Sequence, residues 1–202
     1  MSGIIAQNVG RHTGLMKAPS GGGTWTKIST QTASSSDSLS FTSGIDSTYK
    51  EYVFHFINCH PSDDDAGLEF NFSTDGGSSY AVTKTGTFFF GSHSESGSAS
   101  GLSYIAGRDI AQGTGYARLT SGLDNGSDSA VSGFLHLYDP SSTTFVKNFV
   151  AKANYFNVDA NPELQSCYIA GYGNTTSAID AADFKFSAGT IDEGIISLFG
   201  VT

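Results

Sequence analysis

The densest group of side chains that could bind a metal ion lies around His60. This histidine precedes three adjacent carboxylates, Asp63, Asp64 and Asp65. An imidazole beside carboxylates can bind a divalent cation, but calcium loops place their oxygen ligands at alternate positions around a tight glycine turn. Three contiguous aspartates followed by Ala66 fit that spacing poorly. We therefore expect a solvated acidic loop here, with no metal ion or other cofactor.

Sequence motifs of enzymes are absent. Neither of the phosphate-binding patterns G-x-x-x-x-G-K-[ST] and G-x-G-x-x-G occurs, and the nearest fragment is Gly113-Thr114-Gly115. The chain also lacks a G-x-S-x-G nucleophile elbow and an H-E-x-x-H zinc motif. Glycosidase carboxylates are brought together by the fold and leave no fixed spacing, so a polysaccharide-degrading enzyme remains as a third alternative. The sequence favours a protein that is not an enzyme.

Tyrosine side chains offer a different kind of chemistry. Aromatic rings on the loops or the concave face of a β-sandwich can stack on sugar rings, because one side of the ring is apolar and the hydroxyl is polar. The candidate ligand platforms are Tyr104, Tyr116, Tyr155 and Tyr172. Each of them could instead be a packed sheet residue. A receptor- or glycan-binding module is therefore the alternative function that the sequence leaves open.

The composition favours β-sheets and argues against two classes of partner. The chain has 202 residues, enough for one domain, with 15 Phe, 9 Tyr and 25 Gly but only 14% charged residues. Aromatic residues pack on pleated sheets, and glycine makes turns. The net charge is -9, and the ten Lys and Arg are scattered, so nucleic acid is not expected as a partner. No run of apolar residues is long enough to predict a membrane span.

The two cysteines, Cys59 and Cys167, are too few for a disulfide framework. Cysteine is among the most frequently buried residue types, which favours two buried free thiols. A bridge between Cys59 and Cys167 is the alternative.

Residues 1–23 differ from the remainder of the chain. They contain the apolar residues Ile4, Ile5, Leu15 and Met16 and end in Gly21-Gly22-Gly23, which predicts an assembly arm followed by a hinge. A frayed terminus is the simpler alternative. The segment has no basic region before a long apolar run, so no export signal is expected. The second unit, residues 24–202, is expected to form a β-sandwich domain.

Short strand-like segments separated by turn signals recur from Thr24 onward. Leu68, Phe70 and Phe72 alternate with polar residues, which predicts a strand with one solvated face, and Asp75-Gly76-Gly77 predicts a hairpin that returns through Tyr80 and Val82. A two-layer sandwich or a barrel would accommodate these strands, and a jelly-roll-like antiparallel sandwich is the first choice. The expected strands are 25–31, 38–42, 51–57, 68–73, 85–90, 103–106, 116–119, 132–138, 145–151, 165–171, 182–186 and 194–199.

The end of the chain carries a pattern of its own. Gly189 and Gly194 are expected to bracket a tight hairpin that holds Ile191. The last strand, Ile195 to Phe199, is expected to return and seal the sandwich two residues before Val201. On this interpretation the closing segment is a core strand.

Three regions of the sequence resemble structural proteins of tailed phages, especially cyanophages and other marine phages. They are the segment from Phe70 to Tyr80, the segment from Ser132 to Lys147, and the ending from Ala170 to Gly200 with its pattern G-x-I-x-x-G-x-I-x-L-[FY]-G. In such proteins this kind of domain is associated with tail-fibre-like and head-decorating components. The resemblance implies a virion location and supplies no catalytic residue.

The sequence thus predicts a non-enzymatic virion structural protein that assembles through residues 1–23 and exposes its sandwich on the particle. The expected partners are copies of the chain itself and other capsid or tail proteins, with a host surface glycan as the alternative ligand. Analogy with fibres favours a homotrimer.

Overall fold

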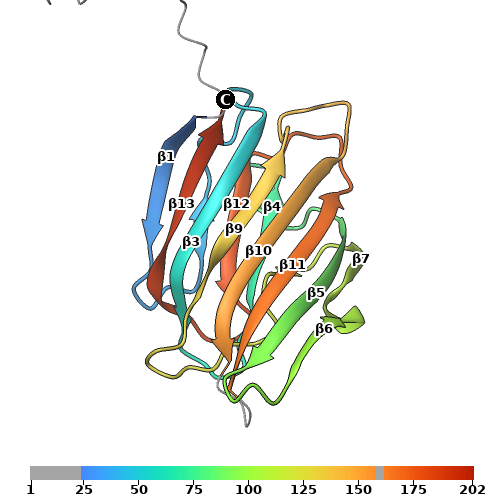
Figure 1. Cartoon of the computed structure of the whole chain (residues 1–202). Coiled ribbons are helices and arrows are strands. Elements are labelled where there is room, and N and C mark those ends of the chain that lie inside the picture. Colours follow the sequence, from blue (N-terminus) through green and yellow to red (C-terminus); the bar gives the residue numbers. More distant parts are fainter. Residues whose placement is uncertain (1–23, 158–161) are drawn as a thin grey trace, which may run out of the picture.

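The computed structural model describes residues 24–157 and 162–202. The predicted assembly residues Ile4, Ile5, Leu15 and Met16 lie outside this part of the chain. The described residues form an all-β, two-layer antiparallel sandwich, as predicted, with one short 3₁₀ helix, η1 (Ala106–Arg108). Figure 1 looks onto the larger sheet, with strands of the smaller sheet behind it.

The larger sheet has nine strands, and all its ladders are antiparallel. Eight of them follow the order β1-β13-β3-β9-β10-β11-β5-β6, and β7 also pairs with β5. Their bounds are β1 (Trp25–Thr32), β3 (Glu51–Pro61), β5 (Lys84–Ser94), β6 (Ser100–Tyr104), β7 (Ile110–Gly113), β9 (Val131–Tyr138), β10 (Lys147–Asn157), β11 (Glu163–Gly173) and β13 (Ile191–Val201).

The smaller sheet has four strands in the order β2-β12-β4-β8. They are β2 (Leu39–Phe41), β4 (Leu68–Ser73), β8 (Ala117–Arg118) and β12 (Ala181–Phe186). Three nested strand pairs alternate between the sheets: β3 with β13 in the larger, β4 with β12 in the smaller, and β5 with β11 in the larger. This alternation wraps the chain in the manner of a jelly roll.

The core between the sheets is rich in phenylalanine. Phe54 of the larger sheet packs against Phe41 and Phe184 of the smaller one, with ring centroids 5.4 and 5.1 Å apart. Phe70 meets Phe149 at 5.2 Å in an edge-to-face arrangement. All five rings are at most 2% exposed. Edge-to-face pairs contribute about 0.5–1.5 kcal/mol each beyond the area they bury, so this cluster joins the two layers.

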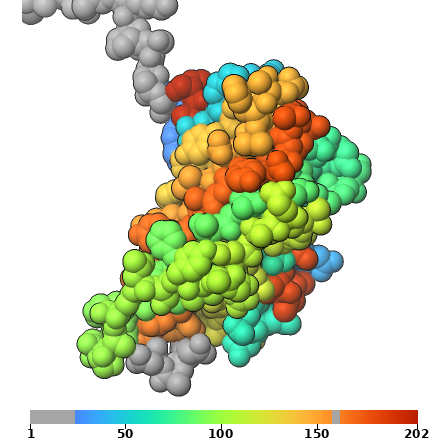
Figure 2. Space-filling model, turned by 90° about the vertical axis from the view of Figure 1, so that its right-hand side faces the viewer, coloured from blue at the N-terminus to red at the C-terminus, as the bar shows by residue number. Residues whose placement is uncertain are grey.

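Each of the twelve strands expected from the sequence overlaps an observed strand, and β7 is the one additional strand among the described residues. Figure 2 looks onto the side of the molecule that carries the β5, β6 and β7 segments. The solvated face expected for residues 68–73 is wrong, because every residue of β4 is buried. The polar residue Asn71, for example, is 0% exposed and donates hydrogen bonds to the Tyr80 and Thr114 carbonyls.

The hairpin predicted at Asp75-Gly76-Gly77 is also wrong. The turn exists, and the Asp75 carboxylate accepts a hydrogen bond from the Ser79 backbone N–H. However, the segment after it forms no strand beside β4, whose partners are β12 and β8. The next strand, β5, joins the other sheet. The turn residues therefore predict that the chain reverses direction here, but they do not predict which strand pairs with β4.

The hairpin predicted between Gly189 and Gly194 is wrong for a related reason. Strands β12 and β13 lie in different sheets and do not pair. Gly194 instead lies within β13, at a bulge in its ladder with β3, and has a φ of +123°, which side chains rarely tolerate. The closing segment is nonetheless a core strand, since β13 lies between β1 and β3 and buries Ile196 and Leu198.

Both cysteines are buried free thiols. Burial raises the pKa of Cys59 and of Cys167 to about 12. In the described part of the chain, no helix has the length and apolar character needed to cross a bilayer.

Candidate binding face

The outward side of the larger sheet is the most distinctive surface of the molecule. No described element of the chain covers it (Figure 1). One row of residues in register across five adjacent strands, which we call the aromatic row, lies on this side. It consists of Phe134 on β9, Lys152 on β10, Tyr168 on β11, Phe89 on β5 and Tyr104 on β6.

The centre of the aromatic row is a stacked pair. The rings of Phe89 and Tyr168 are 5.3 Å apart with an interplanar angle of 12°. The Lys152 ammonium lies 5.2 Å from the centroid of the Tyr168 ring, within the range of a cation–π contact. A hydrogen bond with Ser166 and the neighbouring Lys152 ammonium lower the pKa of Tyr168. The row therefore combines stacked aromatic surface with a positive charge.

Tyr104 at the β6 end is the most accessible ring of the row. It is 60% exposed, against 38% for Tyr168. Its hydroxyl donates a hydrogen bond to the Asp109 carboxylate, just after η1. This bond holds the ring while leaving much of its surface in solvent, which is the arrangement that a stacking platform requires.

Alternation along β10 and β11 places these residues outward. Ala151 and Ala153 are buried on either side of Lys152, and Cys167 and Ile169 are buried on either side of Tyr168. Because the side-chain period of a strand is two, a shift of one residue would bury Lys152 and expose the core residues. The core thus fixes which residues lie on the open side.

The five strands of the aromatic row carry very little negative charge. The chain has 19 Asp and Glu, yet these strands contain a single carboxylate, Glu163 at the start of β11. Glu163 accepts a hydrogen bond from the buried Gln165 amide. Two residues along the same ladder from Lys152 and Tyr168, Asn154 and Ser166 are direct partners and provide hydrogen-bonding groups. The face is thus aromatic and polar, with carboxylates at Glu163 and, beside the Tyr104 hydroxyl, at Asp109.

A second aromatic group lies toward β1 on the same sheet. Trp25, 49% exposed, has its ring 5.5 Å from Phe199 and 6.2 Å from His136. His136 hydrogen bonds to the Glu51 carboxylate and stacks on Tyr138. Exposed aromatic surface thus extends along much of the larger sheet.

No family model, curated protein or solved structure matches this chain. The residues themselves are therefore the basis for assigning a site.

The four predicted platforms are not brought together. Tyr104 belongs to the aromatic row, and Tyr172 lies half-buried on β11, where its ladder partners are Asn148 and Thr85. Tyr116 lies beside the smaller sheet; its hydroxyl donates to Asp183 at 2.9 Å, and the Lys185 ammonium is 4.4 Å from its ring centroid.

The prediction is wrong for Tyr155, which is 3% exposed in the core and donates its hydroxyl to Gln165. A buried ring can stack on no ligand.

Sequence reasoning missed Phe89, Phe134, Lys152 and Tyr168. The available signal was the alternation of small and large residues in 151–154 and 165–169, which marks Lys152 and Tyr168 as outward residues. Their alignment into one row depends on the register of four ladders, which the sequence does not state.

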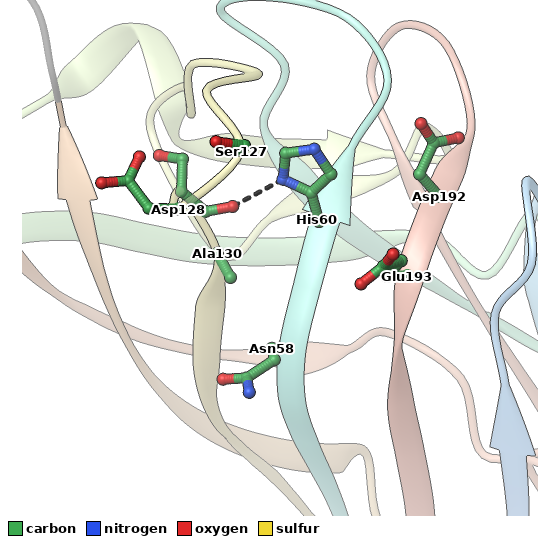
Figure 3. A pocket seen from close by; sticks show the side chains of 8 residues that line it. Asn58, His60, Ser127, Asp128, Ala130, Asp192 and Glu193 are labelled. Atoms are coloured by element: carbon green, nitrogen blue, oxygen red, sulfur yellow. Dashed lines mark hydrogen bonds between the residues drawn. The ribbon is translucent and has the colours of Figure 1, made fainter.

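A polar pocket of about 460 Å³ lies where bulges interrupt β3 and β13 (Figure 3). Its lining includes His60, Asp128, Asp192 and Glu193, and the His60 ring Nδ1 lies 2.6 Å from the Ser129 carbonyl oxygen. Among the described residues, no group of three or more His, Cys, Asp or Glu is placed to hold a metal ion.

The neighbouring Asp63, Asp64 and Asp65 are exposed, as predicted for a solvated loop.

Proposed function

We propose that this chain is a non-enzymatic structural protein of a phage virion, fibre-like or capsid-decorating, that exposes its β-sandwich on the particle surface. The observation that carries the proposal is the broad outward side of the larger sheet, which the described chain leaves open and which carries the aromatic row. The resemblance to tailed-phage structural proteins supports the virion location, and the segments that carry it include parts of β4 and of β9 to β13 together with the turns that follow them.

Assembly is proposed to proceed through residues 1–23, with a homotrimer as the expected state. The apolar residues Ile4, Ile5, Leu15 and Met16 would dock into neighbouring subunits. Light scattering of the purified protein tests this step, with the chain lacking residues 1–20 as the comparison. We expect an oligomer for the full chain and a monomer for the shortened one. A full chain that stays monomeric over a wide concentration range would overturn the proposed assembly.

A second candidate function is glycan binding, and the aromatic row is the specific observation that favours it. Sugar rings present apolar C–H faces that pack on aromatic rings, and their hydroxyls need hydrogen-bonding partners. Tyr104 supplies an exposed ring, while Lys152, Asn154 and Ser166 supply polar groups beside the Phe89 and Tyr168 stack.

A glycan array probed with the purified chain tests this function. We expect binding that is lost in Tyr104→Ala and Tyr168→Ala but kept in Phe145→Ala. Phe145 is a matched control because it is 69% exposed yet precedes β10 and lies outside the aromatic row. Binding that persists in both tyrosine variants would show that the aromatic row is not the sugar site. If the parent chain binds no glycan, the glycan-binding function is rejected and only the structural role remains as a proposal.

A further inference from the structure

Lys84 is a buried lysine without a carboxylate partner. It is 0% exposed, and in the described part of the chain it forms no ion pair. Its ammonium nitrogen donates to the Val82 carbonyl at 2.8 Å and to the side-chain carbonyl of Asn71. The ladder neighbours of Lys84 are Gly173 and Gly113, which bring no side-chain charge beside it. Burying an amine in this way is costly for its charged form.

The carboxamide of Asn71 is held by hydrogen bonds on both of its ends. Its Nδ2 donates to the carbonyls of Tyr80 and Thr114, which fixes which end of the amide is nitrogen. Its Oδ1 accepts from the Phe72 backbone N–H at 2.9 Å and from Lys84. The Phe72 N–H polarises the carbonyl and would stabilise negative charge developing on its oxygen, while the hydrogen bond from Lys84 holds the amine beside the carbonyl carbon.

A carboxylic acid stands next to this pair. Asp183 on β12 is the direct ladder partner of Asn71 on β4, and it is 2% exposed. Side chains directly opposite in an antiparallel ladder lie on the same side of the sheet, with Cβ atoms about 4.5–5.5 Å apart. Tyr116 and Ser40 donate hydrogen bonds to the two Asp183 oxygens. A buried amine is therefore in contact with a polarised carboxamide, and the buried carboxyl group of Asp183 is the neighbour of that carboxamide across the β4–β12 ladder.

We propose that Lys84 and Asn71 join spontaneously in an intramolecular isopeptide bond after the chain has folded. The neutral Lys84 amine attacks Asn71 Cγ, the new Nζ–Cγ bond forms, and the Cγ–Nδ2 bond breaks. One proton passes from Nζ to Nδ2, which leaves as ammonia, so the reaction needs no oxidant, reductant or other reactant. Asp183 is assigned as the group that relays this proton beside the carboxamide.

Folding prepares the two reactants. The amine attacks only when it is neutral, and burial lowers the pKa of Lys84 to about 8, so a substantial fraction is neutral in mildly alkaline solution. Holding the two groups in contact replaces a slow encounter between molecules by a reaction within one molecule. Lys147 provides the contrast, since it is equally buried but donates only to the Phe145 and Thr175 carbonyls, which are backbone amides.

The bond would link the smaller sheet to the larger one, because Asn71 lies on β4 and Lys84 begins β5. A covalent tie at this point resists separation of the layers when the domain is pulled or heated. The inference does not depend on the proposed function, since it concerns chemistry within a single chain.

Intact-mass spectrometry of the purified full chain, before and after incubation at pH 8, tests the proposal. We expect the mass calculated from the sequence less one ammonia molecule. Asp75 is the only acidic residue between positions 71 and 84, so a protease that cleaves at aspartate should release a branched peptide joining Asn71 to Lys84. Locating the branch by fragmentation distinguishes it from ammonia loss at the Asn125-Gly126 step. A full mass after incubation, with Lys84 recovered unmodified, would overturn the proposal.

Single substitutions distinguish the role of Lys84 from that of Asp183. Lys84→Gln should keep the full mass, while Lys147→Gln should still lose ammonia. A folded Asp183→Asn protein is expected to keep the full mass, and ammonia loss in that variant would overturn the role of Asp183. If Asp183→Asn does not fold, the branched peptide in the parent chain still decides whether the bond forms.

Discussion

Phe89 and Tyr168 are direct neighbours on β5 and β11 and stack nearly parallel on the open side of the larger sheet. Such a pair contributes about 0.5–1.5 kcal/mol beyond its buried area and helps to hold the register of the two strands. Because it is exposed, it also offers aromatic surface to a partner. The same two residues therefore stabilise the sheet and form part of the surface that we propose is functional.

The close approach of β9 and β10 at Gly133 should leave no room for a side chain there. A Cβ there would fall against the Lys152 carbonyl oxygen and lie 2.9 Å from Ala153 Cα, both of which are backbone atoms. We expect Gly133→Ala to lower the free energy of unfolding by about 1–3 kcal/mol or more, because the neighbouring strand must shift. Gly101→Ala is the control, since nothing lies within 4 Å of its added Cβ. Equal stability of the two variants in urea unfolding would contradict this packing.

Removal of the Phe184 ring from the core should be costly. It contacts Phe41, Phe54 and Phe70 and is 0% exposed. Phe184→Ala is expected to cost about 3–5 kcal/mol in urea unfolding, from lost burial and from the cavity left behind. Phe145→Ala, at a 69% exposed position, should change stability by at most about 0.5 kcal/mol. Similar losses of stability in the two variants would contradict the packing of Phe184 between the two sheets.

The strands could be predicted from the sequence because each one is specified by residues within it and by the turn residues on either side. Turn residues and β-branched or aromatic runs mark where strands begin and end, and all twelve expected strands exist. Partner choice is not local. The turn at Asp75 was recognised, but the chain beyond it crosses to the other sheet, so the predicted hairpin does not form.

Which side of a strand meets solvent was also predicted only in part. The alternation in β4 correctly separates Phe70 from Asn71, but the chain covers both sides of the strand. The residues that do this covering, such as Tyr80, Lys84 and Thr114, come from outside the strand, so the pattern within 68–73 does not reveal them. The aromatic row escaped prediction for the same reason, since it exists only once four ladders are in register.

The two thiols should be unreactive in the folded protein. Cys59 and Cys167 are 0% exposed, and a thiol-specific reagent at pH 8 is expected to modify neither until the chain is unfolded, when both should react. Failure of both to react after unfolding without reductant would indicate a bridge.

The same thiols should contribute to the pH dependence of stability. Their pKa is raised from 9.0 to about 12 in the folded state, so the folded chain binds protons more tightly. The corresponding stabilisation is complete below pH 9 and is lost as the pH rises toward 12. Urea unfolding at increasing alkaline pH, compared with a Cys59→Ala variant, measures this loss. An equal decline in the variant would assign the alkaline loss to other groups.

The closing strand should be essential. Deletion of residues 195–202 removes most of β13, which lies between β1 and β3. Strand β1 then loses its ladder partner, and β3, which still pairs with β9, becomes an open edge. We expect loss of soluble, cooperative folding, seen as the absence of a sharp thermal transition. Removal of Thr202 alone, an exposed residue after the last strand, is the control. A truncated chain that melts like the complete one would refute this role of β13.

The central claim is that this domain is displayed on a virion, and labelling of intact particles tests it most directly. On our proposal the gene for the chain belongs to a phage. Particles of that phage would be purified, and an antibody against the sandwich, residues 24–202, would be applied before electron microscopy. The account predicts regular labelling of the capsid or the tail, with peptides of the chain present in the same particles. Purified particles that lack the chain would contradict it.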